Sequence, residues 1–300
     1  MNRSVEREDP QLGFRWGESE GTYYLEHPDG DGYRRVSEDA LTLLRKLAGG
    51  EVSRADLDRN ENAADLVDRL ERNGYVDPDA PVVRVEEPPD IRLWPRTVVF
   101  TILLAVGLYA GWVESTRLDG YAGLFEPTKL AAVVVLTGLS VVAHEAAHYV
   151  VARRFVDPSV RLGTVNAVLP AFITDTTGAW ALPRNRRRWI TLAGPYVELW
   201  LLAGLAALHY FAFPDSVVLG ATVLALVGHV LFSLNPLVHG DGYWLLTDTL
   251  GVVNLRTRGL DDLRNRTPSL AAGYVVVSYA YGIATLVASV ALAYRFFGPF

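Results

Sequence analysis

The chain has 300 residues, a net charge of −6 and no cysteine. Without thiols it can form neither disulfides nor thiolate metal sites, so any transition metal must be bound by His, Asp or Glu. Residues 1–90 contain 22 acidic and 12 basic residues, whereas residues 91–300 contain 12 and 16 and nearly all the long apolar runs. We therefore predict a soluble domain at 1–88, followed by a membrane domain at 92–300.

The N-terminal domain is predicted to be a small α+β unit of winged-helix type. Its expected elements are strands at 14–16, 22–25, 33–36 and 75–76, a turn at 29–32 and three helical segments. Ser37 is expected to cap the first helix, which has Leu41, Leu44 and Leu47 on one face and stops at Gly49. A second capped segment begins near Ser53, and a last amphipathic helix ends at Gly74, with its apolar positions at Ala64, Leu66, Val67 and Leu70. Residues 78–89 are predicted to be a linker. The acidity of this domain argues against nucleic acid as a partner, because a phosphate-binding surface needs a basic stripe.

Five apolar stretches approach or exceed the roughly 20 residues that a helix needs to cross a bilayer. They are residues 97–113, 130–152, 189–213, 216–238 and 270–294. Thirteen Arg residues lie before the first stretch, between the second and third, and between the fourth and fifth, against only Arg117, Lys129 and Arg295 in the other flanks. Basic residues near helix ends are retained in the cytoplasm, so we expect a mainly α, multi-pass cell-membrane protein with about five transmembrane helices and a cytoplasmic N-terminus.

The segment 155–187, between the second and third stretches, is too long for a plain turn. Residues 162–182 combine Val, Ile, Thr and Trp with turn residues, which predicts a β-hairpin at the membrane face. Such a hairpin could offer a strand edge to an unfolded peptide. An irregular loop anchored at the interface by Trp180 fits the same composition.

The second apolar stretch contains His144, Glu145 and His148, which match the pattern H-E-x-x-H. On a helix, residues four apart lie one turn above each other, so both imidazoles can bind the same metal ion. Glu145 lies beside the first ligand, where its carboxylate can act as a base toward water. An acid and two imidazoles are costly to insert into a membrane, which favours a functional site over hydrogen bonds between helices alone.

Two histidines leave a zinc ion in need of one more protein ligand and an open position. The fourth stretch ends in N-P-L-V-H-G-D-G-Y-W, residues 235–244, where a proline and two glycines break the helix. A broken backbone is tolerated at membrane depth only where it is buried or lines a cavity. We predict Asp241 as the third ligand, with His239, His229 and Glu198 as alternatives. Asp241 as an ordinary turn residue is the competing interpretation.

The H-E-x-x-H pattern in one span, together with the later N-P-x-x-x-x-D-G, resembles the site-2 protease family of intramembrane zinc metalloproteases over about residues 92–300. Ala193-Gly194-Pro195 in the third span is similar to that family's small-residue helix start. The most compact form in the family is N-P-D-G, and the longer spacing here is similar to its peptide zinc metalloprotease branch. The resemblance implies that zinc is bound by His144, His148 and Asp241, that Glu145 is the catalytic acid and base, and that Asn235 helps to orient the substrate or the oxyanion.

The segment S-E-D-A-L-T-L-L-R-K-L-A-G-G, which starts at Ser37, follows a strand-turn-strand pattern. It resembles the PqqD-like peptide-recognition domain. That family binds the leader of a ribosomally made precursor peptide through a strand edge and a helix groove. A generic winged-helix module for regulation or dimerisation fits the same segment.

These features predict a membrane-embedded zinc metalloprotease that cleaves a precursor peptide or a single-span membrane protein. The alternative is a non-proteolytic zinc-binding membrane component of a peptide export or signalling system. The expected partners are the peptide substrate and the lipid bilayer. The sequence leaves open the substrate itself and whether the chain forms a homo-oligomer.

Overall fold

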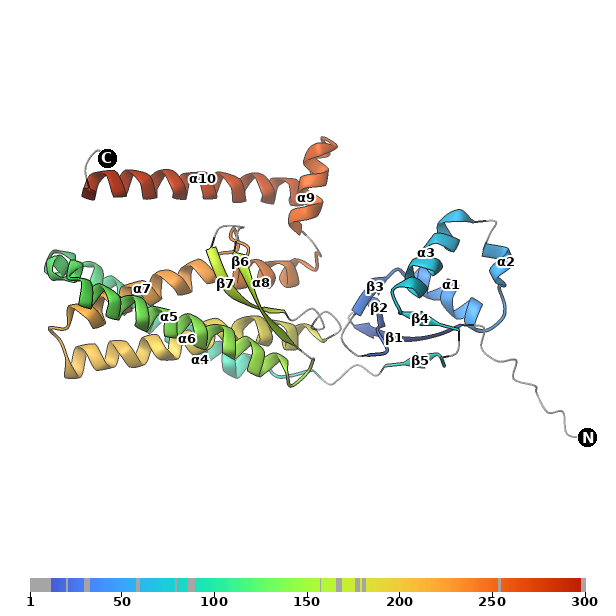
Figure 1. Ribbon diagram of the computed structural model, residues 1–300, viewed down its shortest axis with the longest axis horizontal. Coiled ribbons are helices and arrows are strands. Elements are labelled where there is room, and N and C mark those ends of the chain that lie inside the picture. Colours follow the sequence, from blue (N-terminus) through green and yellow to red (C-terminus); the bar gives the residue numbers. More distant parts are fainter. Residues whose placement is uncertain are drawn as a thin grey trace, which may run out of the picture. The chain divides into compact units, whose positions relative to one another are not determined.

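The structure is a computed structural model that describes residues 12–19, 21–29, 33–57, 60–78, 80–85, 90–156, 158–165, 169–175, 179, 182–252 and 255–297. The described residues belong to two compact units. The first unit draws on Met1–Arg92, Tyr149–Arg161 and Thr174–Arg187, and the second on Leu93–His148, Leu162–Ile173 and Arg188–Phe300. Most elements are helices, and most of the strands lie in the N-terminal domain (Figure 1). The mainly α architecture with a small strand-containing N-terminal domain is therefore confirmed.

The N-terminal domain is built on a sheet with the strand order β3-β2-β1-β4, and β5 also pairs with β1. Its strands are β1 Gly13–Ser19, β2 Thr22–Glu26, β3 Tyr33–Val36, β4 Val76–Asp77 and β5 Val83–Arg84. The first three strands are antiparallel, with Leu25 of β2 opposite Trp16 on one side and Arg34 on the other. This order leaves β3 at one edge of the sheet.

The strand β5 was not expected, because it lies inside the segment 78–89 that we predicted to be a linker. Val83 and Arg84 pair in parallel with Arg15 and Trp16 of β1. Two residues are too short to give a periodic pattern, so the sequence carries no strand signal there. The predicted turn at 29–32 lies partly outside the described residues.

Three helices complete this domain, α1 Glu38–Ala48, α2 Arg54–Leu57 and α3 Glu61–Arg72. Ser37 caps α1 as predicted: its side chain accepts a hydrogen bond from the backbone N–H of Ala40. The helices cover the sheet with a buried core, which includes Leu25, Leu41, Leu44, Leu47, Val67 and Leu70. The apolar spacing along both amphipathic helices therefore identified the face that is buried.

Among the described residues, four helices are long and apolar enough to cross a bilayer, which indicates a membrane protein. They are α4 Trp94–Ser115, α5 Pro127–Ala152, α6 Arg184–Ala212 and the segment Leu270–Ala291 of α10 Leu270–Phe297. The predicted stretch 216–238 forms a shorter apolar helix, α7 Val217–Ser233. This helix ends at Ser233, before the end of the predicted stretch, and residues 234–240 are not helical. Four of the five predicted stretches thus form helices of spanning length.

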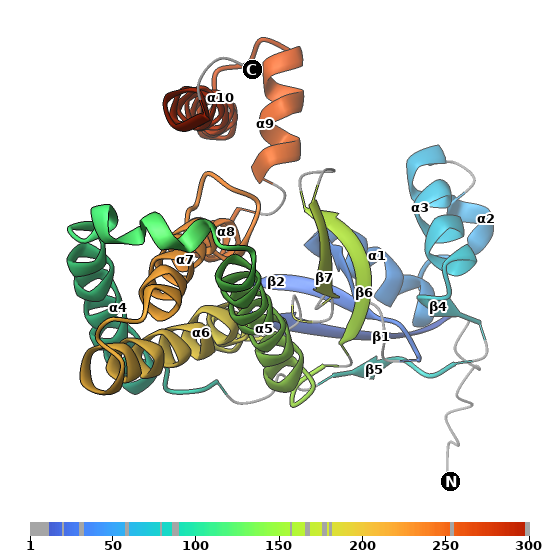
Figure 2. The same ribbon diagram turned by 60° about the vertical axis from the view of Figure 1, so that its left-hand side comes forward.

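Helices α4, α5, α6 and α7 lie together in the second unit (Figure 2). An apolar cluster is buried between α4, α6 and α7 and includes Leu103, Ala110, Leu199, Leu202, Val223 and Leu226. Gly107 allows α4 to approach α6 closely, since a Cβ atom there would lie 2.6 Å from the Leu202 side chain. Small residues at such crossings are typical of helices packed in membranes.

Shorter elements connect these helices. They are the 3-10 helix η1 Leu118–Phe125, the strands β6 Ser159–Val165 and β7 Leu169–Asp175, and the helices α8 Asp241–Leu250 and α9 Leu255–Arg264. The strands β6 and β7 pair with each other. The structure thus has two paired strands in the predicted region, which begin at Ser159 and end at Asp175 instead of spanning 162–182. Their place at the membrane face and their use as an edge for a bound peptide stay predictions.

Candidate metal centre

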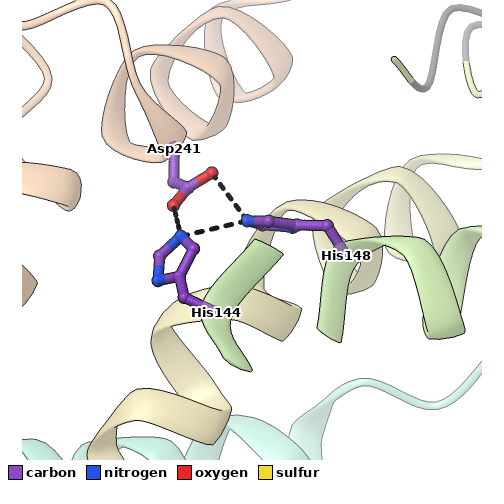
Figure 3. A group of neighbouring side chains, drawn as sticks. All are labelled: His144, His148 and Asp241. Atoms are coloured by element: carbon purple, nitrogen blue, oxygen red, sulfur yellow. Dashed lines mark hydrogen bonds and ion pairs between the residues drawn. The ribbon is translucent and has the colours of Figure 1, made fainter. Parts of the chain in front are cut away.

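His144, His148 and Asp241 meet at one point in the second unit (Figure 3). The two histidines lie one turn apart on α5, and Asp241 is the first residue of α8. The Nε2 atoms of the two imidazoles are 3.2 Å apart. Asp241 Oδ2 lies 3.1 Å from His144 Nε2, and Oδ1 lies 3.3 Å from His148 Nε2. Asp241, which follows the two histidines by 97 and 93 positions, thus joins them in one group of possible metal ligands.

The size of this group fits a small transition-metal ion. Zinc binds nitrogen and oxygen ligands at about 2.0–2.1 Å in a tetrahedron, which places neighbouring ligand atoms about 3.3 Å apart. The two Nε2 atoms are 3.2 Å apart, and each lies close to one oxygen of Asp241, at 3.1 Å (His144 to Oδ2) and 3.3 Å (His148 to Oδ1). Two imidazoles and one carboxylate are also a typical ligand set for zinc, whereas calcium prefers six to eight oxygen ligands. The three side chains can therefore hold a metal ion and leave a fourth position open.

Hydrogen bonds at the other ring nitrogens orient both imidazoles. His148 Nδ1 lies 2.8 Å from the carbonyl oxygen of Ile190, which can only accept, so this nitrogen carries the proton. His144 Nδ1 lies 3.1 Å from a carboxylate oxygen of Glu198. A proton on Nδ1 leaves the lone pair on Nε2, the atom that faces Asp241 in each ring.

Glycine in α6 makes room for the imidazoles. A Cβ atom on Gly194 would collide with the rings of both His144 and His148. Gly194 belongs to the small-residue segment Ala193-Gly194-Pro195 that the sequence analysis singled out. Its backbone therefore forms one wall of the candidate metal centre.

Asp241 is held in place by residues at the end of α7. Ser233 Oγ donates a hydrogen bond of 2.6 Å to Asp241 Oδ2. Gly242 lies so close to the end of α7 that a Cβ atom would come within 2.2 Å of the Leu234 carbonyl oxygen. Burial alone would raise the pKa of Asp241, but the positive charge and hydrogen bonds of protonated His148 and His144 outweigh it and hold that pKa below its usual value. Metal binding would require both rings to lose the proton on Nε2.

The helix break between α7 and α8 receives hydrogen bonds from α10. Tyr274 donates from its hydroxyl group to the Pro236 carbonyl oxygen at 2.9 Å, and Ser278 donates to the Leu237 carbonyl oxygen at 2.6 Å. A proline-containing break frees such carbonyls from the helix, and apolar surroundings make an unsatisfied one costly. The segment that presents Asp241 is thereby fixed from a third helix.

The two predicted catalytic residues, Glu145 and Asn235, lie on different elements: Glu145 on α5 and Asn235 in the helix break after α7. Glu145 is half-buried on α5 and follows His144 directly. Asn235 uses its Oδ1 atom to accept a hydrogen bond from the Leu237 N–H at 2.9 Å, which stabilises the turn at the helix break. The catalytic roles of both residues stay predictions.

The alternative third ligands separate into two groups. His239 stacks on Tyr243 and Trp244, with ring centroids 4.8 and 5.3 Å away, and belongs to no possible metal group among the described residues. Glu198 and His229 form a second group with His144, and their closest atoms are 2.7 Å apart. Asp241 alone of the four candidates faces the Nε2 atoms of both histidines.

Sequence reasoning missed Ser233, Tyr274 and Ser278. Each is one hydroxyl-bearing residue in an apolar helix, and its spacing from the metal ligands follows no pattern that a sequence would reveal. The one available signal is that Ser233 precedes Asn235 of the N-P break by two residues and is therefore close to the predicted site in the sequence.

No family model, no curated protein and no solved structure matches this chain.

Proposed function

We propose that the chain is a membrane-embedded zinc metalloprotease similar to site-2 proteases. The carrying observation is the group of His144, His148 and Asp241, in which the two Nε2 atoms are 3.2 Å apart and each lies within 3.3 Å of an Asp241 oxygen, close to the ligand spacing around a tetrahedral zinc ion. This group is combined with an acid, Glu145, at the second position of H-E-x-x-H. In that pattern on a helix, the glutamate is the general base of metalloproteases.

The proposal assigns metal binding to three side chains, proton transfer to Glu145 and substrate orientation to Asn235. His144, His148 and Asp241 would hold the zinc ion. When bound, zinc supplies a Lewis acid for the peptide carbonyl and makes water a better nucleophile. Glu145 takes the proton from the attacking water and delivers it to the nitrogen of the leaving amine. Asn235 is assigned to orienting the substrate by the resemblance alone.

The proposed substrate is a membrane-associated or precursor peptide that is cleaved near the cytoplasmic face. The excess of Arg in the flanks at one side of the spans supports a cytoplasmic N-terminus. His148 lies five residues before Arg153 on α5, which supports a metal site close to that side. A peptide bond must be presented in an extended conformation, so a membrane helix must unwind locally before it is cut.

The N-terminal domain is proposed to bind the substrate as PqqD-like domains do. Two observations support this: β3 is an edge strand, and α1 packs its buried face on the same sheet. An extended peptide can add to such an edge through main-chain hydrogen bonds. Binding of a fluorescent precursor peptide to the full chain tests this part separately from cleavage.

The test of the enzyme activity uses the full chain in detergent, with zinc content and cleavage of a peptide library both measured. Glu145→Gln should lower cleavage by about 100-fold or more, because the proton transfer is lost, while zinc stays bound. Glu126→Gln, at an exposed glutamate paired with Lys129, is the matched control and should cleave normally. Cleavage at the normal rate by Glu145→Gln contradicts the assignment. Bound zinc without peptidase activity in the unaltered chain supports the non-proteolytic alternative.

A further inference from the structure

Glu198 is an acid in the middle of α6 whose side chain is completely buried, with 0% exposure. An ionisable group inside a membrane helix is costly to insert and usually has a functional partner. A buried carboxylate also needs hydrogen bonds to both of its oxygens to offset the loss of water. Glu198 meets this need with two imidazole rings, from two different helices.

The two oxygens of Glu198 have different partners. Oε2 lies 3.1 Å from Nδ1 of His144 on α5, and Oε1 lies 2.7 Å from Nδ1 of His229 on α7. An ionised carboxylate can only accept hydrogen bonds, so each Nδ1 atom carries a proton. In the neutral His144 ring that binds a metal, a proton on Nδ1 puts the lone pair on Nε2, which is the atom that faces Asp241 and His148.

We propose that Glu198 is a positioning residue of the metal centre, which fixes the tautomer and the ring orientation of His144, and that His229 holds Glu198 in place. A histidine that binds a metal commonly donates its other N–H to a carboxylate, which also makes it a stronger ligand. The inference rests on the metal site of the proposed function and is independent of proteolysis.

The distances separate this role from that of a second metal site. His144, Glu198 and His229 also form a group that could hold a metal ion. However, the 2.7 Å between Glu198 Oε1 and His229 Nδ1 is a hydrogen-bond distance, shorter than the edge of about 3.3 Å in a zinc tetrahedron. A second ion would also need Nδ1 of His144 without its proton.

The experiment measures zinc affinity of the full chain in detergent by competition with a chelator. Glu198→Leu removes the acceptor, yet an apolar residue of similar size commonly preserves the fold at a buried charge. We expect zinc affinity to fall by about 10–100-fold. Glu198→Gln keeps an oxygen that can accept from His144 Nδ1, so it should restore most of the affinity. His229→Phe should cause a smaller loss than Glu198→Leu.

A second measurement reports the geometry of the site directly. Cobalt(II) replaces zinc, and its visible absorption depends on the arrangement of its ligands. The spectrum of Glu198→Leu should differ from that of the unaltered chain, whereas the spectrum of Glu198→Gln should resemble it. If Glu198→Leu does not fold, Glu198→Ala leaves room for water and is expected to show the same loss.

Glu114 provides a matched control. It is also a buried glutamate in a spanning helix, with 1% exposure, and its partners are Tyr121, Arg117 and His209. The substitution Glu114→Gln removes a buried charge of the same kind without touching the candidate metal centre. Its zinc affinity and its cobalt spectrum should equal those of the unaltered chain.

Three results would overturn the proposal. Unchanged affinity and spectrum in Glu198→Leu mean that His144 needs no positioning by Glu198. Complete loss of zinc in both Glu198→Leu and Glu198→Gln, as in His144→Ala, makes Glu198 a ligand. Two zinc ions per chain, with one lost in His229→Phe, make the second group a metal site. If the unaltered chain binds no zinc, the proposed function fails as well, whereas the other results leave it intact.

Discussion

Gly194 lies directly against the imidazole of His148: a Cβ atom on Gly194 would come within 2.4 Å of Nε2. The same atom would lie 2.5 Å from Nε2 of His144. Real Cβ atoms do not approach other atoms so closely, and the two Nε2 atoms belong to the candidate metal centre. The site therefore depends on the absence of one methyl group from the opposing helix.

We predict that Gly194→Ala lowers zinc affinity by at least tenfold, because the two imidazoles must turn away from Asp241. Gly204→Ala is the control on the same helix, since nothing lies within 4 Å of a Cβ atom there. Its affinity should be unchanged, and its helix should gain slight stability from the better helix former. Equal affinities of the two variants would contradict the packing argument. Chelator competition measures both.

Ser233→Ala should weaken zinc binding by about tenfold. The 2.6 Å hydrogen bond from Ser233 orients the Asp241 carboxylate, and a hydrogen bond to a charged group is worth about 1.5–3 kcal/mol. Ser289→Ala, at a hydroxyl that bonds only within α10, is the control and should bind zinc normally. A Ser233→Ala variant with normal affinity would show that the histidines and the helix break suffice to place Asp241.

Combining Tyr274→Phe with Ser278→Ala should lower thermal stability and zinc affinity together. Both changes remove donors to the carbonyls of the helix break, and each hydrogen bond contributes about 0.5–1.5 kcal/mol. Tyr281→Phe, at a tyrosine on the same helix that is 38% exposed, is the control. Thermal unfolding followed by circular dichroism and chelator competition give the two readouts. Lower stability with normal zinc affinity would limit α10 to a role in packing.

Removal of zinc should lower the unfolding temperature of the chain in detergent, and added zinc should restore it. An ion that binds only the folded state at 100 times its Kd stabilises that state by about 2.7 kcal/mol. His144→Ala should unfold at the same temperature with and without zinc, because it lacks one ligand. If neither the chelator nor added zinc changes the unfolding temperature of the unaltered chain, this would argue against a metal in this site.

The predictions from the sequence succeed where the signal is local. Ser37 marks the start of α1 because a cap acts within three residues, and Leu41, Leu44 and Leu47 mark its buried face because helical periodicity is local as well. The spacing of His144 and His148 likewise determines that they share a helix face. Asp241 was found because a helix break with an acid is rare in an apolar stretch.

What the sequence did not reveal depends on contacts between distant residues. The pairing of β5 with β1, and the hydrogen bonds from Tyr274 and Ser278 to the helix break, arise only when separate segments meet. Glu198 was recognised as a possible ligand because it is an acid in a span. Its contact with Nδ1 of His144 arises where α6 meets α5, and no local sequence pattern predicts that contact.

The hydrogen bonds from α10 to the helix break have a consequence for the order of assembly. The carbonyls of Pro236 and Leu237 find their donors on a helix that begins about 30 residues further along the chain, at Leu270. The histidines and Asp241 are therefore synthesised before the donors that fix the backbone around Asp241. A chain ending before α10 would contain all three side chains of the candidate metal centre but would lack the hydrogen bonds to the carbonyls of the helix break.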